Sequence, residues 1–121
     1  MQNPLISENI DAISSAEGLA NAVEDEFGVK YSKDGLRLLK SNKNITNYVV
    51  KAGTRVICDG AFARCSGLTS VTIPNSVKSI GDHAFYKCSS LKDIIIPSGT
   101  KRKFARLLPD NKYQLVAQWS S

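Results

Sequence analysis

The chain has 121 residues, of which 42% are hydrophobic and 22% charged, a composition typical of one globular domain. Its longest purely aliphatic run, residues 94–96, is far shorter than the roughly 18 residues that a membrane-spanning helix needs, which excludes such a span. The net charge of +5 is unevenly distributed: residues 1–27 carry six acidic and no basic side chains, and residues 28–121 carry all sixteen basic ones.

The amino-terminal segment lacks the features of a secretory signal. Residues 1–8 are polar and end on Glu8, whereas a signal begins with basic residues and continues into an apolar stretch of about 7–15 residues. If Met1 is the native start, we expect a cytoplasmic protein; the alternative is a cell-surface or secreted protein whose signal has been removed. The three cysteines cannot all pair within one chain, and this odd number fits a reducing compartment.

Residues 14–27 are expected to form a helix, with another short helix conceivable over residues 5–13. Ser14 and Glu17 make a capping-box pattern, and Gly28 is a natural helix stop. The apolar residues of this segment share one helical face: Ala16, Leu19, Ala20, Val23 and Phe27. We therefore predict an acidic helical cap that docks on the basic remainder of the chain. After this cap, the apolar segments 29–32 and 36–40 flank Asp34-Gly35, a strong hairpin signal.

Residues 57–76 and 80–99 are two copies of one repeat, offset by 23 residues without a gap. Nine of twenty positions are identical: Ile57/Ile80, Asp59/Asp82, Ala61/Ala84, Phe62/Phe85, Cys65/Cys88, Ser66/Ser89, Leu68/Leu91, Ile73/Ile96 and Pro74/Pro97. A further shift of 23 residues toward the amino terminus predicts a degenerate earlier copy. It places Ile45, Tyr48 and Val50 on Leu68, Val71 and Ile73, and Leu39 on Phe62.

Each copy is expected to consist of a short strand and a tight turn. Val71 and Ile73 alternate at the two-residue period of a strand with one buried face, and the following proline ends that strand. Ala61, Phe62 and Cys65 suit one turn of α- or 3₁₀-helix that is buried on one side. One copy alone cannot bury its apolar face, so we expect the copies to stack with equivalent residues in contact.

Residues 80–97 resemble the BspA-type leucine-rich repeat, whose units follow roughly the pattern I-G-x-x-A-F-x-x-C-x-x-L-x-x-I-x-I-P. The resemblance covers residues 53–100, and residues 31–39 are similar to a Tyr-Ser-x-Asp-Gly segment that often precedes such repeats. It implies an α/β fold, a short leucine-rich-repeat solenoid of about two to three 23-residue coils. It also implies a role in adhesion or protein interaction, often on bacterial or protist surfaces, with no enzymatic activity inherent in the repeat.

The carboxy-terminal residues are expected to form a helical end. Phe104, Leu107 and Leu108 make a helical stripe that Pro109 interrupts, and a final apolar set follows, comprising Tyr113, Leu115, Val116 and Trp119. Because two or three coils are near the lower limit for a stable array, both flanks should act as caps. We therefore divide the chain into a helical cap, 1–28, and a repeat domain, 29–121, which comprises the hairpin and degenerate coil 29–52, the repeats 53–100 and the cap 101–121.

Enzymatic and metal chemistry have little support, and we assign no catalytic, cofactor-binding or metal-binding residue. His83 is the single histidine, and it stands where the other copy has Gly60, which favours a surface turn over a catalytic role. Cys58, Cys65 and Cys88 could form a Cys₃His zinc site with His83, but their spacing lacks the short C-x₂₋₄-C pairs of structural zinc sites. We interpret Cys65 and Cys88 as small buried residues of the repeat.

The basic residues Lys101, Arg102, Lys103 and Arg106 form a candidate anion-binding patch, which would contact phosphates if nucleic acid were the partner. We favour a solvated helix face, or one paired with the acidic amino-terminal segment, and regard nucleic acid as an unfavoured partner. Binding to nucleic acid would weaken steeply with salt, so a mobility-shift titration would test it.

A second candidate site is the outward face of the predicted strands. Side chains that flank the inward residues stack in two columns across the copies. The columns are Val49, Thr72 and Ile95, and Asn47, Ser70 and Asp93. This face could contact an unidentified protein partner or a second copy of the chain, unless a terminal element covers it. We predict a non-enzymatic protein-interaction module, with a surface adhesin fragment of the same fold and a basic nucleic-acid-binding protein as alternatives.

Overall fold

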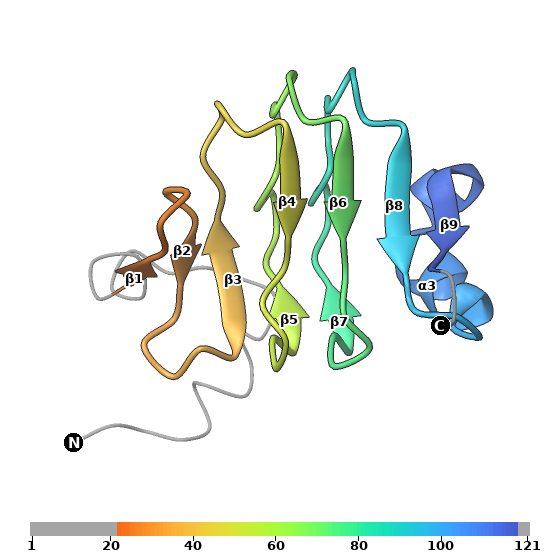
Figure 1. Ribbon diagram of the computed structural model, residues 1–121, viewed down its shortest axis with the longest axis horizontal. Helices are drawn as coiled ribbons and strands as arrows, with labels where there is room; N and C mark the ends of the chain where they lie inside the picture. Colours follow the sequence, from red (N-terminus) through yellow and green to blue (C-terminus); the bar gives the residue numbers. More distant parts are fainter. Residues whose placement is uncertain (1–21, 119–121) are drawn as a thin grey trace.

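The computed structural model describes residues 22–118, which form two sheets, a short α-helix and a 3₁₀-helix. The elements are β1 (Val23–Glu24), β2 (Lys30–Tyr31), β3 (Arg37–Lys40), β4 (Asn47–Val49), β5 (Val56–Ile57), β6 (Ser70–Thr72), β7 (Ser79–Ile80), β8 (Asp93–Ile96), α3 (Lys101–Leu107), η1 (Pro109–Gln114) and β9 (Leu115–Ala117). One sheet has the order β1-β2-β3-β5-β7 and the other β4-β6-β8-β9. In Figure 1 the strands follow one another along the long axis from β1 to β9.

The two repeat copies stack in register at the predicted 23-residue offset. β5 pairs in parallel with β7, with Val56 opposite Ser79, and β6 pairs in parallel with β8, with Val71 opposite Ile94. Each copy therefore contributes one strand to each sheet, whereas the sequence predicted a single strand per copy. The unpredicted strands β5 and β7 are two residues long, too short to show an alternating pattern.

The pairing expected for the degenerate earlier copy is confirmed in the four-stranded sheet, whereas the five-stranded sheet has a different offset. β4 pairs with β6 at the expected 23-residue offset. β3, however, pairs with β5 with Leu38 opposite Ile57, an offset of 19 residues. The expected equivalence of Leu39 and Phe62 is therefore wrong. The reason is that the chain between β3 and β4 is four residues shorter than the chain between β5 and β6, measured between equivalent paired positions.

The segment after β5, and its equivalent after β7, is a series of tight turns and not the expected turn of helix. Gly60 and Arg64 have φ angles of 62° and 64°, and their repeat equivalents His83 and Lys87 have φ angles of 59° and 57°. Two left-handed residues in each copy interrupt right-handed helical geometry, so a regular helix does not form. The expected burial is confirmed, since Phe62 is completely inaccessible.

Equivalent residues of successive copies fill the core between the sheets. The Phe62 ring stacks on Phe85 with centroids 5.1 Å apart, and Tyr48 of the degenerate copy packs against Phe62 at 6.1 Å. Cys65 Sγ lies 3.0 Å from the hydroxyl oxygen of Ser41 in the preceding copy. The predicted contacts between equivalent aromatic residues are therefore present, and they extend by one ring into the degenerate copy.

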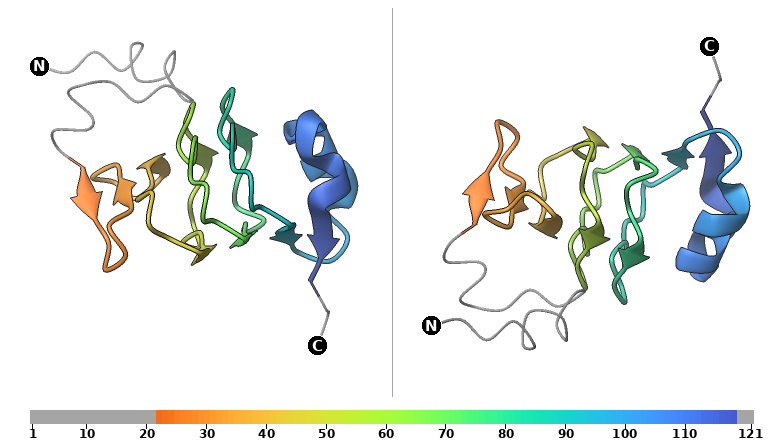
Figure 2. Two further views of the ribbon diagram at one scale, coloured as in Figure 1. Left: turned by 90° about the horizontal axis from the view of Figure 1, so that it is seen from above. Right: turned by 90° about the horizontal axis from the view of Figure 1, so that it is seen from below.

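The elements α3, η1 and β9 lie at the end of the sheets opposite β1 (Figure 2). Phe104, Leu108 and Leu115 are buried there and belong to the main core. The final apolar set is partly a strand and not purely a helical end, because β9 pairs in parallel with β8, with Val116 opposite Ile95. Of that set, Trp119 lies outside the described residues.

The hairpin predicted around Asp34-Gly35 is confirmed by the antiparallel pairing of β2 with β3. The Asp34 carboxylate accepts hydrogen bonds from the Ser32 hydroxyl at 2.6 Å and from the Leu36 N–H at 3.0 Å. Gly35 adopts a φ of 76°, which glycine reaches without a steric penalty. The loop of the hairpin is therefore organised by the two residues that the sequence singled out.

Residues 22–28 do not form the end of the predicted helix. Val23 belongs to β1, which pairs antiparallel with β2, and both Val23 and Phe27 are exposed. The Asp25 carboxylate accepts hydrogen bonds from the N–H groups of Phe27 and Val29, both at 2.9 Å, and this local bonding favours a turn over a helix. The rest of the predicted acidic cap, residues 1–21, lies outside the described residues.

Candidate protein-interaction face

The outward face of the four-stranded sheet carries a row of side chains that we call the apolar strip: Val49, Thr72, Ile95 and Val116. The register of β4, β6, β8 and β9 places these four residues side by side. Val49 is 67% exposed and Val116 is 42% exposed, whereas Thr72 and Ile95 are half-buried. With strands about 4.8 Å apart, the strip is about 14 Å long. The first three residues form the predicted column; Val116 was missed because β9 was not predicted.

The other predicted column, Asn47, Ser70 and Asp93, lies beside the apolar strip as its polar border. The Asn47 side-chain oxygen accepts hydrogen bonds from the hydroxyl of Ser70 at 2.6 Å and from that of Thr69 at 3.1 Å. These bonds join β4 to β6 through their side chains and fix the orientation of Asn47. Asp93, at the other end of the border, is exposed.

Phe27 extends the exposed apolar surface beyond β4. Its ring is 54% exposed and meets Tyr48 edge-on, with centroids 6.0 Å apart. A shallow pocket of about 180 Å³ is formed here by Phe27, Asn47, Tyr48, Val49, Ser70 and Thr72. Phe27 was not predicted as a surface residue, because its helical spacing placed it on a buried face.

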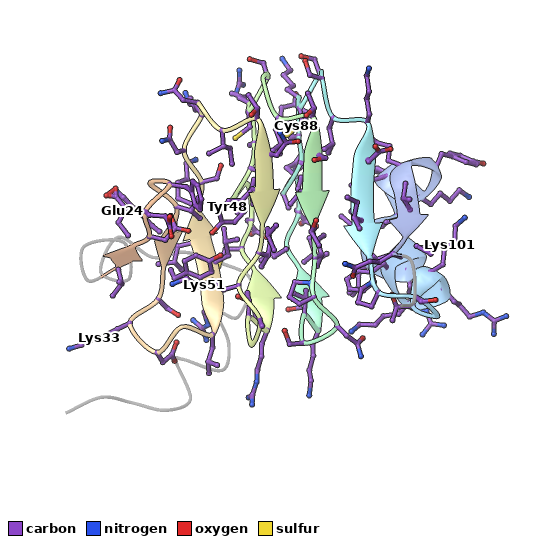
Figure 3. All side chains as sticks on the ribbon, viewed as in Figure 1. Glu24, Lys33, Tyr48, Lys51, Cys88 and Lys101 are labelled. Atoms are coloured by element: carbon purple, nitrogen blue, oxygen red, sulfur yellow. The ribbon has the colours of Figure 1, made fainter. Side chains whose placement is uncertain are left out.

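A chain of hydrogen bonds beneath Phe27 holds this end of the face. The Tyr48 hydroxyl donates to Asp25 Oδ2 at 2.5 Å, and the hydroxyl oxygens of Tyr31 and Tyr48 are 2.6 Å apart. Because Tyr48 gives its single proton to Asp25, Tyr31 must donate to Tyr48. Tyr31 in turn accepts a hydrogen bond from the Lys51 N–H at 3.2 Å. The chain thus joins the β1–β2 turn to β4, and Figure 3 shows Tyr48 and Lys51 at this end of the molecule.

These contacts also fix the ionisation of the groups involved. Burial raises the pKa of Tyr48 far above its ordinary value, and the hydrogen bond to Asp25 raises it further. Burial alone would raise the pKa of Asp25, but hydrogen bonds from Tyr48, Val29 and Phe27 outweigh that effect and lower it below 3.8. At neutral pH, Asp25 is therefore charged and Tyr48 is neutral.

The basic patch predicted from the sequence lies on α3, and Figure 3 shows Lys101 at the end of the molecule away from Glu24. Lys103 Nζ donates to the backbone oxygen of Asn75 at 2.6 Å and to its side-chain oxygen at 3.0 Å. Burial lowers the pKa of Lys103. Lys103 thus ties α3 to the turn after β6, whereas Lys101, Arg102 and Arg106 are exposed.

The cysteines and the histidine occupy structural positions. Burial raises the pKa of Cys58 and of Cys88 to about 11, so at neutral pH neither is the thiolate that nucleophilic chemistry requires. Cys88 Sγ donates to the carbonyl oxygen of Phe62 at 3.0 Å. The His83 ring meets Tyr86 edge-on, with centroids 5.0 Å apart, on an exposed turn. Within residues 22–118, no group of three His, Cys, Asp or Glu side chains is placed to hold a metal ion.

Tandem 23-residue copies, joined by parallel strands around a leucine- and isoleucine-lined core, define a leucine-rich-repeat protein. A family described as "BspA type Leucine rich repeat region (6 copies)" has a sequence model that matches residues 38–106. Since this match covers more than half of the chain, the protein belongs to the BspA-type leucine-rich-repeat family. Comparisons with curated proteins and with solved structures gave no match.

Membership of this family suggests a protein-interaction repeat module, and its members are typically not enzymes. The family is associated with cell-surface proteins. Across residues 22–118, no helix has the length and apolarity needed to cross a membrane.

Proposed function

We propose that this protein is a short leucine-rich-repeat solenoid without enzymatic activity that binds another protein through the apolar strip. The observation that carries the proposal is the exposure of Val49, a β-branched residue in a sheet strand with 67% of its surface accessible. Exposed aliphatic side chains aligned over several strands are a common feature of protein-binding surfaces. The flanking elements support the solenoid, since the β1–β2 hairpin and the α3–β9 segment lie at its two ends and bury Tyr31 and Phe104.

The composition of the face favours a protein over a small molecule. An apolar centre with a polar border, here Asn47, Ser70 and Asp93, is the usual arrangement of a protein interface. The adjoining pocket of about 180 Å³ is smaller than the roughly 300–1,000 Å³ typical of small-molecule sites. A flat strip with a shallow pocket at one end suits one or two anchoring side chains of a partner.

Affinity capture from the source cell tests this proposal with three forms of the full chain. Val49→Lys places a charge at the most exposed position of the strip, so partners captured by the wild type should be lost. Val23→Lys is the matched control, because Val23 is also an exposed valine in an edge strand but belongs to the other sheet. Equal capture by wild type and Val49→Lys, with both folded by circular dichroism, would contradict the proposal.

A surface adhesin of the same fold is the second candidate, favoured by the association of the family with cell-surface proteins. In that case the native protein should be cleaved when protease is added to intact source cells, and antibodies against the strip should block attachment. Full protection from protease in intact cells, with cleavage after lysis, would instead support a cytoplasmic interaction module.

A further inference from the structure

The two full repeat copies are joined by a ladder of backbone hydrogen bonds in their turns, separate from the sheets. The N–H groups of Gly60, Phe62 and Arg64, which we call the first-copy row, donate to carbonyl oxygens of the second copy. The acceptors are Asp82, Ala84 and Tyr86, at 3.0, 2.8 and 2.6 Å respectively. Alternate residues donate, so the turns of the two copies are joined in register by their backbones.

The second copy repeats this row of donors without an acceptor. The equivalent N–H groups, 23 residues further on, belong to His83, Phe85 and Lys87, which we call the open row. The φ angles of His83 and Lys87 match those of Gly60 and Arg64 within 7°, so the open row points away from the first copy as its counterpart points toward the second. No residue among 22–118 accepts a hydrogen bond from the open row. Backbone N–H groups are strong donors, so this row favours an incoming acceptor.

A groove of about 280 Å³ lies beside the open row and is lined by two of its residues, His83 and Phe85. One wall is residues 80–86 and the other is residues 107–111, at the junction of α3 and η1. After β8 the chain continues into α3 and η1 and does not form a third copy. The groove is therefore the space that the turn of a further copy would fill.

We infer that this groove binds a peptide segment that adopts the same series of turns as residues 82–86, and whose backbone carbonyls accept hydrogen bonds from the open row. The internal precedent is residues 82–86, which occupy the equivalent position on the first-copy row. Phe104 and Leu108 already fill the core at this end, so the inward side chain of the peptide must be small. This site is distinct from the apolar strip and does not depend on the function proposed for that surface.

A second copy of this chain is not the expected occupant. Its own carbonyls of residues 82, 84 and 86 already accept hydrogen bonds from its first-copy row. At its other end, the carbonyl of Ala61 accepts from the N–H of Ser41. These engaged carbonyls favour a different polypeptide segment as the source of the acceptors.

The test uses the full-length ¹⁵N-labelled protein and a synthetic peptide with the sequence of residues 80–89, in which alanine replaces the phenylalanine and serine replaces the cysteine. Without peptide, amides of the open row should exchange with solvent at least about tenfold faster than those of the first-copy row, because each lacks one hydrogen bond. With peptide at millimolar concentration, the open row should shift and its exchange should slow, while the first-copy row stays unchanged.

Two variants on η1 sharpen the test. Asp110→Trp places a bulky ring in the groove wall and should abolish the peptide-induced shifts, whereas Lys112→Trp, outside the wall, should preserve them. Equal exchange of the two rows in the peptide-free protein, or no shift of the open row with peptide, would overturn the inference. A concentration-dependent dimer that protects the open row without peptide would overturn it as well, in favour of self-association.

Discussion

Gly81 marks the tightest backbone approach between the two full copies, and its replacement by alanine tests how closely they must stack. A Cβ atom added at Gly81 would meet Oδ1 and the backbone nitrogen of Asp59 and would lie 2.7 Å from its Cα. The obstacle is mostly backbone, so a side-chain rotation cannot remove it. The same Asp59 carboxylate accepts a hydrogen bond from the Asp82 N–H at 2.7 Å, which the displacement would break.

The expected loss of stability for Gly81→Ala is the sum of two effects. Overpacking of a well-packed contact costs about 1–3 kcal/mol, and one lost hydrogen bond adds about 1 kcal/mol. We therefore expect the free energy of unfolding to fall by about 2–4 kcal/mol. Gly67→Ala is the matched control, because its Cβ would lie 3.9 Å from the nearest atom and its φ is not positive. It should be neutral or stabilise by up to about 1 kcal/mol.

Urea unfolding followed by far-ultraviolet circular dichroism measures both changes, with the midpoint expected to move at constant slope. If the free energies of unfolding of Gly81→Ala and Gly67→Ala differ by less than about 0.5 kcal/mol, the copies tolerate wider spacing and do not require the close approach at Gly81.

Four further predictions concern the turns and the ionisable groups. Gly60→Ala should lower the free energy of unfolding by about 1 kcal/mol, because φ is 62° there, although the new Cβ would lie 3.8 Å from the nearest atom. His83→Gly, at a φ of 59°, should raise the free energy of unfolding by up to about 1 kcal/mol in the same assay. Because folding lowers the pKa of Asp25 below its ordinary value of 3.8, the ionised carboxylate stabilises the fold at any pH above 3.8. This stabilisation is lost as the pH falls through the pKa of Asp25 in the folded protein. Unfolding from pH 7 to 2 should therefore show a smaller acid-induced loss in Asp25→Asn. Burial raises the pKa of Cys58 to about 11, so at pH 8 its thiol should react with Ellman's reagent far more slowly in folded than in urea-unfolded protein; equal rates would contradict its burial.

The repeat and the hairpin could be predicted because their signals are local and recur. The 23-residue offset fixed the register of β6 and β8, and with it the row of Val49, Thr72 and Ile95 on one face. Asp34-Gly35 likewise carries its turn chemistry within a few residues of sequence. Such features depend on neighbouring residues or on exact spacing, both of which the sequence displays.

The missed features depend on contacts between distant residues. β1 forms because Asp25 bonds to the turn and to Tyr48, 23 residues away, and these bonds override the helical pattern. The positive φ of Arg64 and Lys87 has no sequence signal, since basic residues rarely adopt it. Val116 joins the apolar strip only through the pairing of β9 with β8. The contribution of the carboxy-terminal strand β9 to the candidate face, Val116, could therefore not be predicted from the repeat alone.

The shortened connection between β3 and β4 determines at which end of the array a further repeat copy can be added. The degenerate copy is four residues shorter than the two full copies that follow it, so a full-length copy placed before it would have no matching turn on which to stack. The second copy, by contrast, presents a turn of full length. An extra 23-residue cassette inserted between the second copy and α3 should therefore be accommodated, lengthening each sheet by about 4.8 Å. The protein can thus be enlarged as a modular scaffold at one end only.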